Sequence, residues 1–387
     1  MAEDIQLIPN AMIAEAIAQT GLTDFGDAPM MEGLQALCRS LQTEVRLTEE
    51  GRSRIVNELV NVLAQRLQVE DWYKRHPEID AVEIKAPLFI MGLPRSGTSA
   101  LSQFFAEDPQ MRTLRRWELE WPTPPPTADG QANDPRRARM QALIDARDAE
   151  APERKAKINT IADDPGENGV LLKYTFLSIH FIAFAGIPTY LDWLWKQDLV
   201  PGYAYMNRVL KLLLWKCPPE QWNLRHPMDI MAIDAILAVW PDARLVWSHR
   251  DPAKTIPSAI SLTQGERVQF SPIDDLRADA RGLTEAFHEM VRRGLRSRST
   301  LAPGRIVDVY NVDLVRDPVG ALSAAYLKLG LEFSEIYKAQ IQERMRVRPK
   351  GQFGEHKPDL DAFGITPDGV RKFFAEYIEQ CRVPIEG

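Results

Sequence analysis

Cysteine is scarce in this chain of 387 residues, which contains only Cys38, Cys217 and Cys381. They are widely spaced and form no Cys-x-x-Cys pair, so neither a disulfide framework nor a thiolate zinc site is expected. The six histidines also lack the spacing of a metal-ligating pair. We therefore expect no bound metal, and the cysteine usage indicates the reducing environment of the cytoplasm.

An excess of positive charge is absent as well. The chain has 47 lysines and arginines against 54 aspartates and glutamates, which gives a formal net charge of -7. A general nucleic-acid binder needs a positive surface, so no nucleic-acid partner is expected. An anionic cofactor would have to be bound by a local group of cations.

Long hydrophobic runs are missing too. The N-terminus carries Glu3 and Asp4 where a signal peptide would be basic. Residues 174–191 lack formal charges, but His180, Gly186 and Pro188 interrupt them, and a spanning helix needs about 20 apolar residues. We expect no transmembrane segment, and interpret residues 174–191 as a buried helix or pocket wall.

Hydrophobic residues nevertheless make up 45% of the chain, enough for a large core. Residues 1–80 are predicted to be a helical extension, because apolar residues between Ile55 and Leu67 recur with a period near 3.6. They would cap the site or mediate association into a homo-oligomer. Residues 81–387 are predicted to form one α/β domain with a helical acceptor-site insertion around 136–220.

Four short apolar runs in this domain are predicted to be strands, and helical patterns separate them. The runs are residues 86–91, 222–225, 243–248 and 305–310. The clearest helical patterns are residues 98–106, 229–239, 274–296 and 318–329. The alternation predicts a P-loop-like parallel β-sheet flanked by helices, with ligands at the carboxyl ends of the strands.

The first strand leads into Gly92-Leu93-Pro94-Arg95-Ser96-Gly97-Thr98-Ser99, which has the Gly-x4-Gly spacing of a Walker A loop. Glycines allow a tight turn, and free N–H groups at the helix start point at an anion. However, Thr98 replaces the lysine that contacts the β- and γ-phosphates in nucleoside triphosphatases, and the cation is Arg95. The loop therefore suits a smaller anion than a triphosphate.

A second anion-binding pair follows the third strand. Arg250 stands at the strand end, and Ser258 lies eight residues later, about two turns into the next helix. An arginine fork and a hydroxyl can converge on one phosphate. Taken alone, the pair favours a structural role, with Arg250-Asp251 as a salt bridge and Ser258 as a helix residue beside Pro257.

Together these segments resemble the sulfotransferases that use 3′-phosphoadenosine 5′-phosphosulfate (PAPS), in particular the bacterial-type branch. The 5′-phosphosulfate loop and the 3′-phosphate motif carry the resemblance, which extends over residues 86–380. Lys350-Gly351-Gln352-Phe353-Gly354 is similar to the Lys-Gly-x-x-Gly loop of that family.

The resemblance implies a PAPS-dependent transferase, with PAPS as co-substrate and no metal. The 5′-phosphosulfate would be held by Arg95, Ser96, Gly97, Thr98 and Ser99. The 3′-phosphate would be held by Arg250, Ser258, Lys350 and Gly351.

The implied reaction moves a sulfuryl group to a hydroxyl or amine of a small acceptor. Arg95 would stabilise the charge that grows on the leaving phosphate. A general base must take the acceptor proton. His226 is the first candidate, because it follows a strand on the same rim, and Asp229 and Glu118 are rivals. Asp229 could equally cap a helix.

The acceptor is predicted to be hydrophobic or aromatic, since aromatic residues cluster between positions 190 and 222 beside the apolar run 174–191. Such a cluster is also compatible with a core. Two other functions stay open: a P-loop small-molecule kinase, and a catalytically inactive nucleotide-binding homologue. The kinase would turn over ATP with Mg²⁺, and the inactive homologue would bind nucleotide without transfer.

Overall fold

Five strands form one parallel sheet in the computed structural model, which describes residues 7–150, 160–217, 221–348 and 358–387. Their order is β2-β3-β1-β4-β5. The bounds are β1 (Leu88–Gly92), β2 (Met111–Thr113), β3 (Gln221–Arg225), β4 (Arg244–His249) and β5 (Ile306–Tyr310). The predicted parallel α/β sheet is confirmed. The sequence missed only β2, whose three residues are too few to show a pattern.

The central strand β1 is buried on both faces, as expected of a parallel sheet. Leu88 and Ile90 contribute to one hydrophobic cluster, whereas Phe89 and Met91 contribute to a second, larger one. This alternation follows from the two-residue period of a strand. The sheet is therefore covered by helices on both sides.

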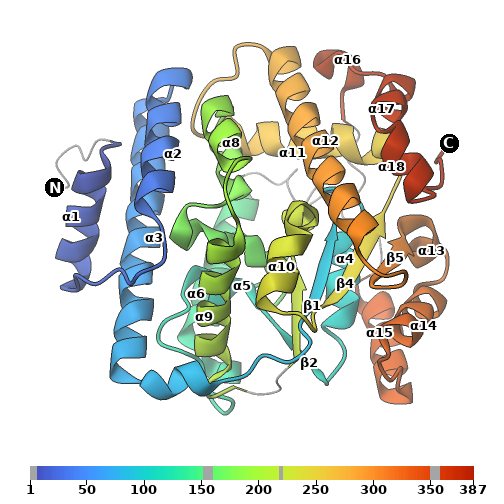
Figure 1. The fold of residues 1–387 in the computed structure, drawn as a ribbon, viewed down its shortest axis with the longest axis horizontal. Coiled ribbons are helices and arrows are strands. Elements are labelled where there is room, and N and C mark those ends of the chain that lie inside the picture. Colours follow the sequence, from blue (N-terminus) through green and yellow to red (C-terminus); the bar gives the residue numbers. More distant parts are fainter. Residues whose placement is uncertain (1–6, 151–159, 218–220, 349–357) are drawn as a thin grey trace.

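On the smaller side, four helices bury apolar side chains in the cluster of Leu88. They are α4 (Thr98–Phe105), α13 (Asn311–Arg316), α14 (Pro318–Leu329) and α15 (Glu335–Val347). On the larger side, the main covering helices are α9 (Val200–Leu214), η5 (Pro227–Ala232), α10 (Ile233–Val239), α11 (Pro252–Arg267) and α12 (Leu276–Thr300). In Figure 1, α10 and α12 cross the near face of the sheet.

The predicted helices agree with these elements, with differences at two of them. Helix α14 has the expected bounds, and α12 is longer than expected by four residues at its C-terminal end. The pattern at 229–239 divides into the 3₁₀ helix η5 and the α-helix α10.

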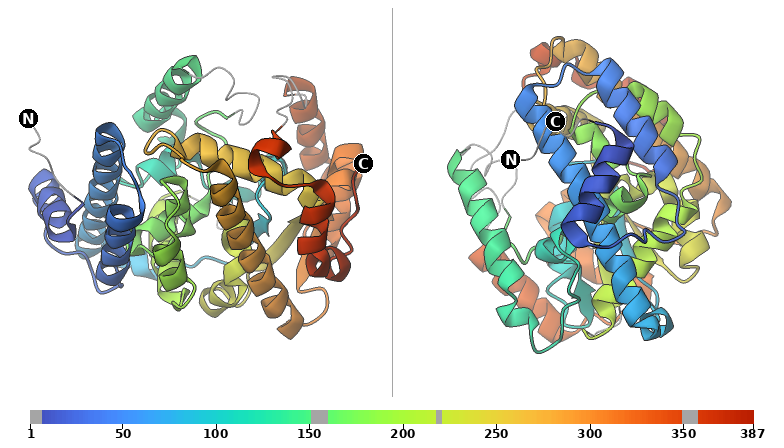
Figure 2. Two further views of the ribbon diagram at one scale, coloured as in Figure 1. Left: turned by 90° about the horizontal axis from the view of Figure 1, so that it is seen from above. Right: turned by 90° about the vertical axis from the view of Figure 1, so that its left-hand side faces the viewer.

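The N-terminal helices pack together at one end of the molecule, against the green part of the chain (Figures 1 and 2). They are α1 (Pro9–Thr20), α2 (Met31–Glu44), α3 (Glu49–Arg75) and the 3₁₀ helix η1 (Pro77–Ala81). Their buried residues, such as Leu59 and Leu63, belong to the same cluster as Phe89. These helices therefore share the core of the sheet.

Short helices fill the region between β2 and β3. They are α5 (Arg116–Glu120), η2 (Gln131–Asn133), α6 (Pro135–Glu150), η3 (Asn168–Thr175), η4 (Ile179–Ala183) and α8 (Pro188–Leu194). Residues 174–191 are thus divided among three short helices. Within the described ranges, no helix has both the length and the hydrophobicity needed to cross a bilayer.

Three helices complete the chain near the C-terminus. They are α16 (Leu360–Phe363), α17 (Pro367–Phe373) and α18 (Ala375–Gln380). Helix α17 packs against α11, and α18 packs against α12. The C-terminal residues therefore lie near the helices that follow β4 at its carboxyl end.

Candidate active site

The loop between β1 and α4 requires an unusual backbone. Gly97 has φ of +106°, and a Cβ there would lie 2.5 Å from the Nδ2 atom of Asn311. Arg95 has φ of +72°, in the left-handed region that side chains seldom adopt. The loop thus holds a strained arginine and a glycine that no other residue can replace without displacing its neighbours.

A cavity of about 450 Å³ opens at this loop, at the carboxyl ends of the strands. Four arginines line it against a single carboxylate. The lining is formed by Pro94, Arg95, Gly97, Thr98, Ser99, Ala100, Gln103, Arg116, Thr160, Pro165, Glu167, Arg225, Pro227, Arg250, Leu262 and Asn311. Below it is called the donor cavity.

The arginines of the donor cavity repel one another. Burial lowers the pKa of Arg95, and the charge of Arg250 lowers it further. The pKa of Arg116 is lowered to about 10, first by burial and then by Arg225. A bound anion would relieve both effects, so the electrostatics fit a strongly anionic ligand.

The buried hydroxyl of Ser96 also fits such a ligand. Its Oγ atom has no hydrogen-bond partner within the described chain, although the residue is fully buried. An orphaned buried donor is costly and is common at binding sites.

The predicted 3′-phosphate residues lie beside the loop. Arg250 follows β4 and lines the donor cavity, and Ser258 lies within α11. Arg95 donates a hydrogen bond from Nε to the Oγ of Ser258 at 3.1 Å, which joins the two predicted motifs. Ser96 and Ser258 are not part of the cavity lining, and Lys350 and Gly351 lie outside the described residues.

Glu167 is the one carboxylate of the donor cavity, and the sequence analysis did not identify it. Arg225 lies 2.8 Å from its Oε1 atom, and the same guanidinium donates to Ser99 Oγ at 2.8 Å. Burial raises the pKa of Glu167, but Arg225 and the ring of His226 outweigh burial and hold it well below the usual range. Glu167 is therefore an ionised carboxylate facing an arginine-rich cavity.

Two histidines lie behind this carboxylate. Nδ1 of His226 is 3.6 Å from Glu167 Oε2, and Nε2 of His180 is 3.7 Å from the same atom. His226 is only 1% exposed and packs against Gly169, where a Cβ would lie 2.4 Å from its ring. The predicted base His226 thus contacts the site through Glu167.

Glu167, His180 and His226 also place potential metal ligands within 4.8 Å of one another. However, the two imidazole rings are stacked with an interplanar angle of 18°. Ring nitrogens donate in the plane of the ring, so two nearly parallel rings cannot both aim at one ion between them. The stacked arrangement of the described rings therefore does not fit a single metal ion between them.

The rival bases lie away from the cavity. Glu118 is fully buried, forms an ion pair with Arg112 and accepts a hydrogen bond from the Arg115 N–H. Asp229 is also fully buried, and accepts hydrogen bonds from the Tyr203 hydroxyl at 2.6 Å and the Asn168 amide at 2.9 Å.

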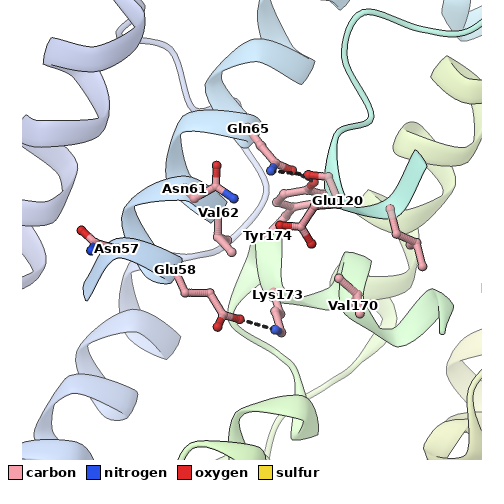
Figure 3. Close-up of a pocket in the computed structure, with 10 residues that line it drawn as sticks. Asn57, Glu58, Asn61, Val62, Gln65, Glu120, Val170, Lys173 and Tyr174 are labelled. Atoms are coloured by element: carbon pink, nitrogen blue, oxygen red, sulfur yellow. Dashed lines mark hydrogen bonds and ion pairs between the residues drawn. The ribbon is translucent and has the colours of Figure 1, made fainter. Parts of the chain in front are cut away.

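A second cavity, of about 410 Å³, lies between α3 and η3. Figure 3 shows Glu58 and Asn61 on one side of it and Lys173, Tyr174 and Glu120 on the other. The complete lining is Asn57, Glu58, Asn61, Val62, Gln65, Leu119, Glu120, Val170, Lys173 and Tyr174. Most of these side chains are polar.

The two cavities have no lining residue in common, but helix α5 contributes to both. Helix α5 presents Arg116 to the donor cavity and Glu120, about one turn later, to the second. Burial and the charge of His226 lower the pKa of His180, Glu167 opposes them, and the charge of Lys173, in the second cavity, adds a smaller lowering.

The aromatic cluster between residues 190 and 222 is part of the core. Tyr190, Tyr203, Tyr205 and Trp222 are each at most 1% exposed. None of the cluster is found in the lining of either cavity given above. The structure therefore supports the alternative in which these aromatic residues belong to the hydrophobic core.

The protein has a parallel sheet flanked by helices, a glycine-bearing loop before a helix and a cavity lined by four arginines. These features define a P-loop-like protein that binds an anion. Residues 87–335 match the model of the sulfotransferase family. The chain belongs to this family and is a sulfotransferase, of a class of enzymes that uses PAPS.

Solved structures agree with this assignment over the whole chain. Sulfotransferase STF9 from Mycobacterium avium is 27% identical and covers all of both chains, with a TM-score of 0.91. Sulfotransferase STF1 from Mycobacterium tuberculosis H37Rv is 28% identical over 95% of this chain and 98% of its own, with a TM-score of 0.85.

A more local similarity joins the chain to a sulfotransferase with a named acceptor. The omega-hydroxy-beta-dihydromenaquinone-9 sulfotransferase Stf3 of Mycobacterium tuberculosis is 26% identical over 127 residues. That alignment spans 31% of this chain and 31% of the Stf3 enzyme.

Proposed function

We propose that the protein transfers the sulfuryl group of PAPS to a hydroxyl of a small molecule. The observation that supports this most is the donor cavity, where Arg95, Arg116, Arg225 and Arg250 surround the loop of Gly97. The co-substrate carries phosphate and sulfate groups at two separate positions. Such a ligand needs positive charge at both ends, and Arg95 and Arg250 supply it.

The loop residues would hold the 5′-phosphosulfate through Arg95, the hydroxyls of Thr98 and Ser99, and the N–H of Gly97, whereas the Ser96 hydroxyl lies outside the cavity lining. Arg250 would hold the 3′-phosphate, with Ser258 fixing the neighbouring Arg95. Lys350 and Gly351 stay assigned to the 3′-phosphate by the family resemblance alone.

In the reaction, the acceptor oxygen forms a bond to sulfur while the bond from sulfur to the phosphate oxygen breaks. Adenosine 3′,5′-bisphosphate leaves, and negative charge develops on its 5′-phosphate. Arg95 would stabilise that charge in a partly buried site, where a fixed cation has a large effect.

We propose Glu167 as the group that takes the acceptor proton. It is the only carboxylate in the lining of the donor cavity, whereas Glu118 and Asp229 are buried and bonded elsewhere. The proposal revises the order of candidates from the sequence. His226 becomes the residue behind Glu167, which helps to orient the carboxylate.

We also propose that the second cavity holds the part of the acceptor remote from the reacting hydroxyl. Both cavities take lining residues from α5 and from the segment that begins at Glu167, which is the observation that supports this proposal. Stf3 acts on a lipid-like quinone, which agrees with the predicted hydrophobic acceptor. The polar lining of the second cavity instead favours an acceptor with a polar substituent.

Calorimetric titration with adenosine 3′,5′-bisphosphate and with ATP–Mg²⁺ tests the donor assignment, in the wild type and in Arg250→Ala. We expect tight binding of the bisphosphate and its loss in the variant. Binding of ATP alone would favour the kinase instead. Transfer of labelled sulfate from PAPS then separates an active transferase from an inactive homologue.

A further inference from the structure

The C-terminal tail reaches the predicted 3′-phosphate residue. Arg250 donates from Nε to Glu386 Oε1 at 3.1 Å and from Nη2 to Glu386 Oε2 at 3.4 Å. The two residues are 136 positions apart. The predicted function does not account for this ion pair, because a carboxylate repels the phosphate that Arg250 is expected to bind.

The backbone of Glu386 is held in place from two sides. Its N–H donates to Asp251 Oδ2 at 3.0 Å, and its carbonyl accepts from Arg371 Nη2 at 2.7 Å. Asp251 is fully buried, caps α11 through the Ala253 N–H and pairs with Arg371 at 2.8 Å. The tail is therefore anchored to the residue that begins the helix of the 3′-phosphate motif.

The carboxylate approaches Arg250 from outside the donor cavity. Arg250 is part of the cavity lining, and Glu386 is not. The pair uses Nε and one hydrogen of Nη2, which leaves the Nη1 hydrogens and the second Nη2 hydrogen for a ligand. A phosphate on that remaining edge would still be bound by two parallel hydrogen bonds.

We propose that Glu386 is a positioning residue, which orients the Arg250 guanidinium so that its free edge faces the 3′-phosphate. An arginine side chain has several rotatable bonds, and fixing it before binding removes an entropic cost. This inference rests on the proposed binding of PAPS. It adds that the C-terminal tail sets the affinity for the 3′-phosphate.

The test measures the affinity of the full chain for adenosine 3′,5′-bisphosphate and for AMP, which lacks the 3′-phosphate. We expect Glu386→Gln to weaken bisphosphate binding about tenfold, the effect of one charge-assisted hydrogen bond, and to leave AMP binding within about twofold. In kinetics, the KM for PAPS should rise while kcat stays unchanged. In an Arg250→Ala background, the same substitution should have no further effect.

A matched control is Glu343→Gln, which breaks an exposed pair with Arg346 away from the site. Unchanged or tighter bisphosphate binding in Glu386→Gln would overturn the inference, the latter because it would show that the carboxylate competes with the phosphate. An equal loss of AMP affinity would overturn it too, as a general structural effect. If the wild type binds the bisphosphate no better than AMP, the proposed function itself is wrong.

Discussion

The side chains of Arg95 and Ser258 are joined by a hydrogen bond of 3.1 Å, although 163 residues separate them. Arg95 belongs to the loop after β1, and Ser258 lies in the helix after β4, the neighbouring strand. The bond couples the groups proposed for the two ends of PAPS. A change at Ser258 should therefore reach the 5′ end of the co-substrate as well.

Arg95→Ala is expected to lower turnover by about 10²–10³-fold, because it removes the cation proposed to stabilise the leaving phosphate. Steady-state kinetics with labelled PAPS measure the effect. Ser258→Ala should cause a smaller loss, since Arg95 keeps its charge but loses one hydrogen bond. Near-normal rates in Arg95→Ala would show that the loop has been assigned the wrong role.

Glu167→Gln is expected to lower kcat by about 10²–10³-fold while leaving the affinity for adenosine 3′,5′-bisphosphate nearly unchanged. The amide keeps the shape of the side chain but cannot take a proton. Glu118 offers a comparison, since its carboxylate pairs with Arg112 in the protein interior. Glu118→Gln should reduce stability, seen as a lower Tm, rather than abolish transfer in the protein that remains folded.

The pH profile gives a separate test of the same base. Arg225 and His226 hold the pKa of Glu167 well below its usual range, so the carboxylate stays ionised as the pH falls. The active form is therefore lost only when the pH falls through that lowered value. We expect kcat/KM to stay level between about pH 8 and about pH 5, whereas a decline near neutral pH is typical of a histidine base.

The sequence predicted the frame of the site well, because its signals are local. Short segments of the sequence were enough to predict four strands, the glycine loop and Arg250. The loop and Arg250 each follow the end of a strand. Glu167 could not be found in this way. Its position depends on a contact with Arg225, which is 58 residues away in the sequence. Glu167 itself lies in a run of short helices whose hydrophobic residues follow no regular period.

The rival bases show the opposite error. Asp229 was considered because it stands where the resembling family commonly has a histidine, and Glu118 because it is an acidic residue soon after the first helix of the sheet domain. Whether such a residue faces a cavity or a partner inside the protein depends on tertiary contacts. Tyr203 binds Asp229 from 26 residues away.

Gly169→Ala tests the link between Glu167 and His226. The added Cβ would lie 2.4 Å from Nε2 and Cδ2 of His226, so the ring must move. We expect a loss of stability of about 1–3 kcal/mol and a lower kcat. Gly282→Ala is the control, because a Cβ at this helical position meets nothing within 4 Å and should slightly stabilise the protein.

Asn61→Leu tests the second cavity as part of the acceptor site. Asn57 and Asn61 both line this cavity, where their side-chain amides can donate to and accept from a ligand. Burial raises the pKa of Glu120 against the opposing charge of Lys173, and the amide groups of Asn57, Asn61 and Gln65 line the same cavity. The lining therefore suits neutral hydroxyl or amide groups.

We expect Asn61→Leu to raise the KM for acceptors that carry such groups by about tenfold, the effect of losing one or two hydrogen bonds. The KM for PAPS should not change, since Asn61 is not part of the donor cavity lining. Rates with matched alcohols, one bearing a polar substituent and one purely hydrocarbon, provide the measurement. A wild type that prefers the hydrocarbon alcohol, with Asn61→Leu unchanged, would place the acceptor elsewhere. The polar result is the expected one, because seven of the ten side chains that line the second cavity are polar and would be left without partners by a purely hydrocarbon acceptor.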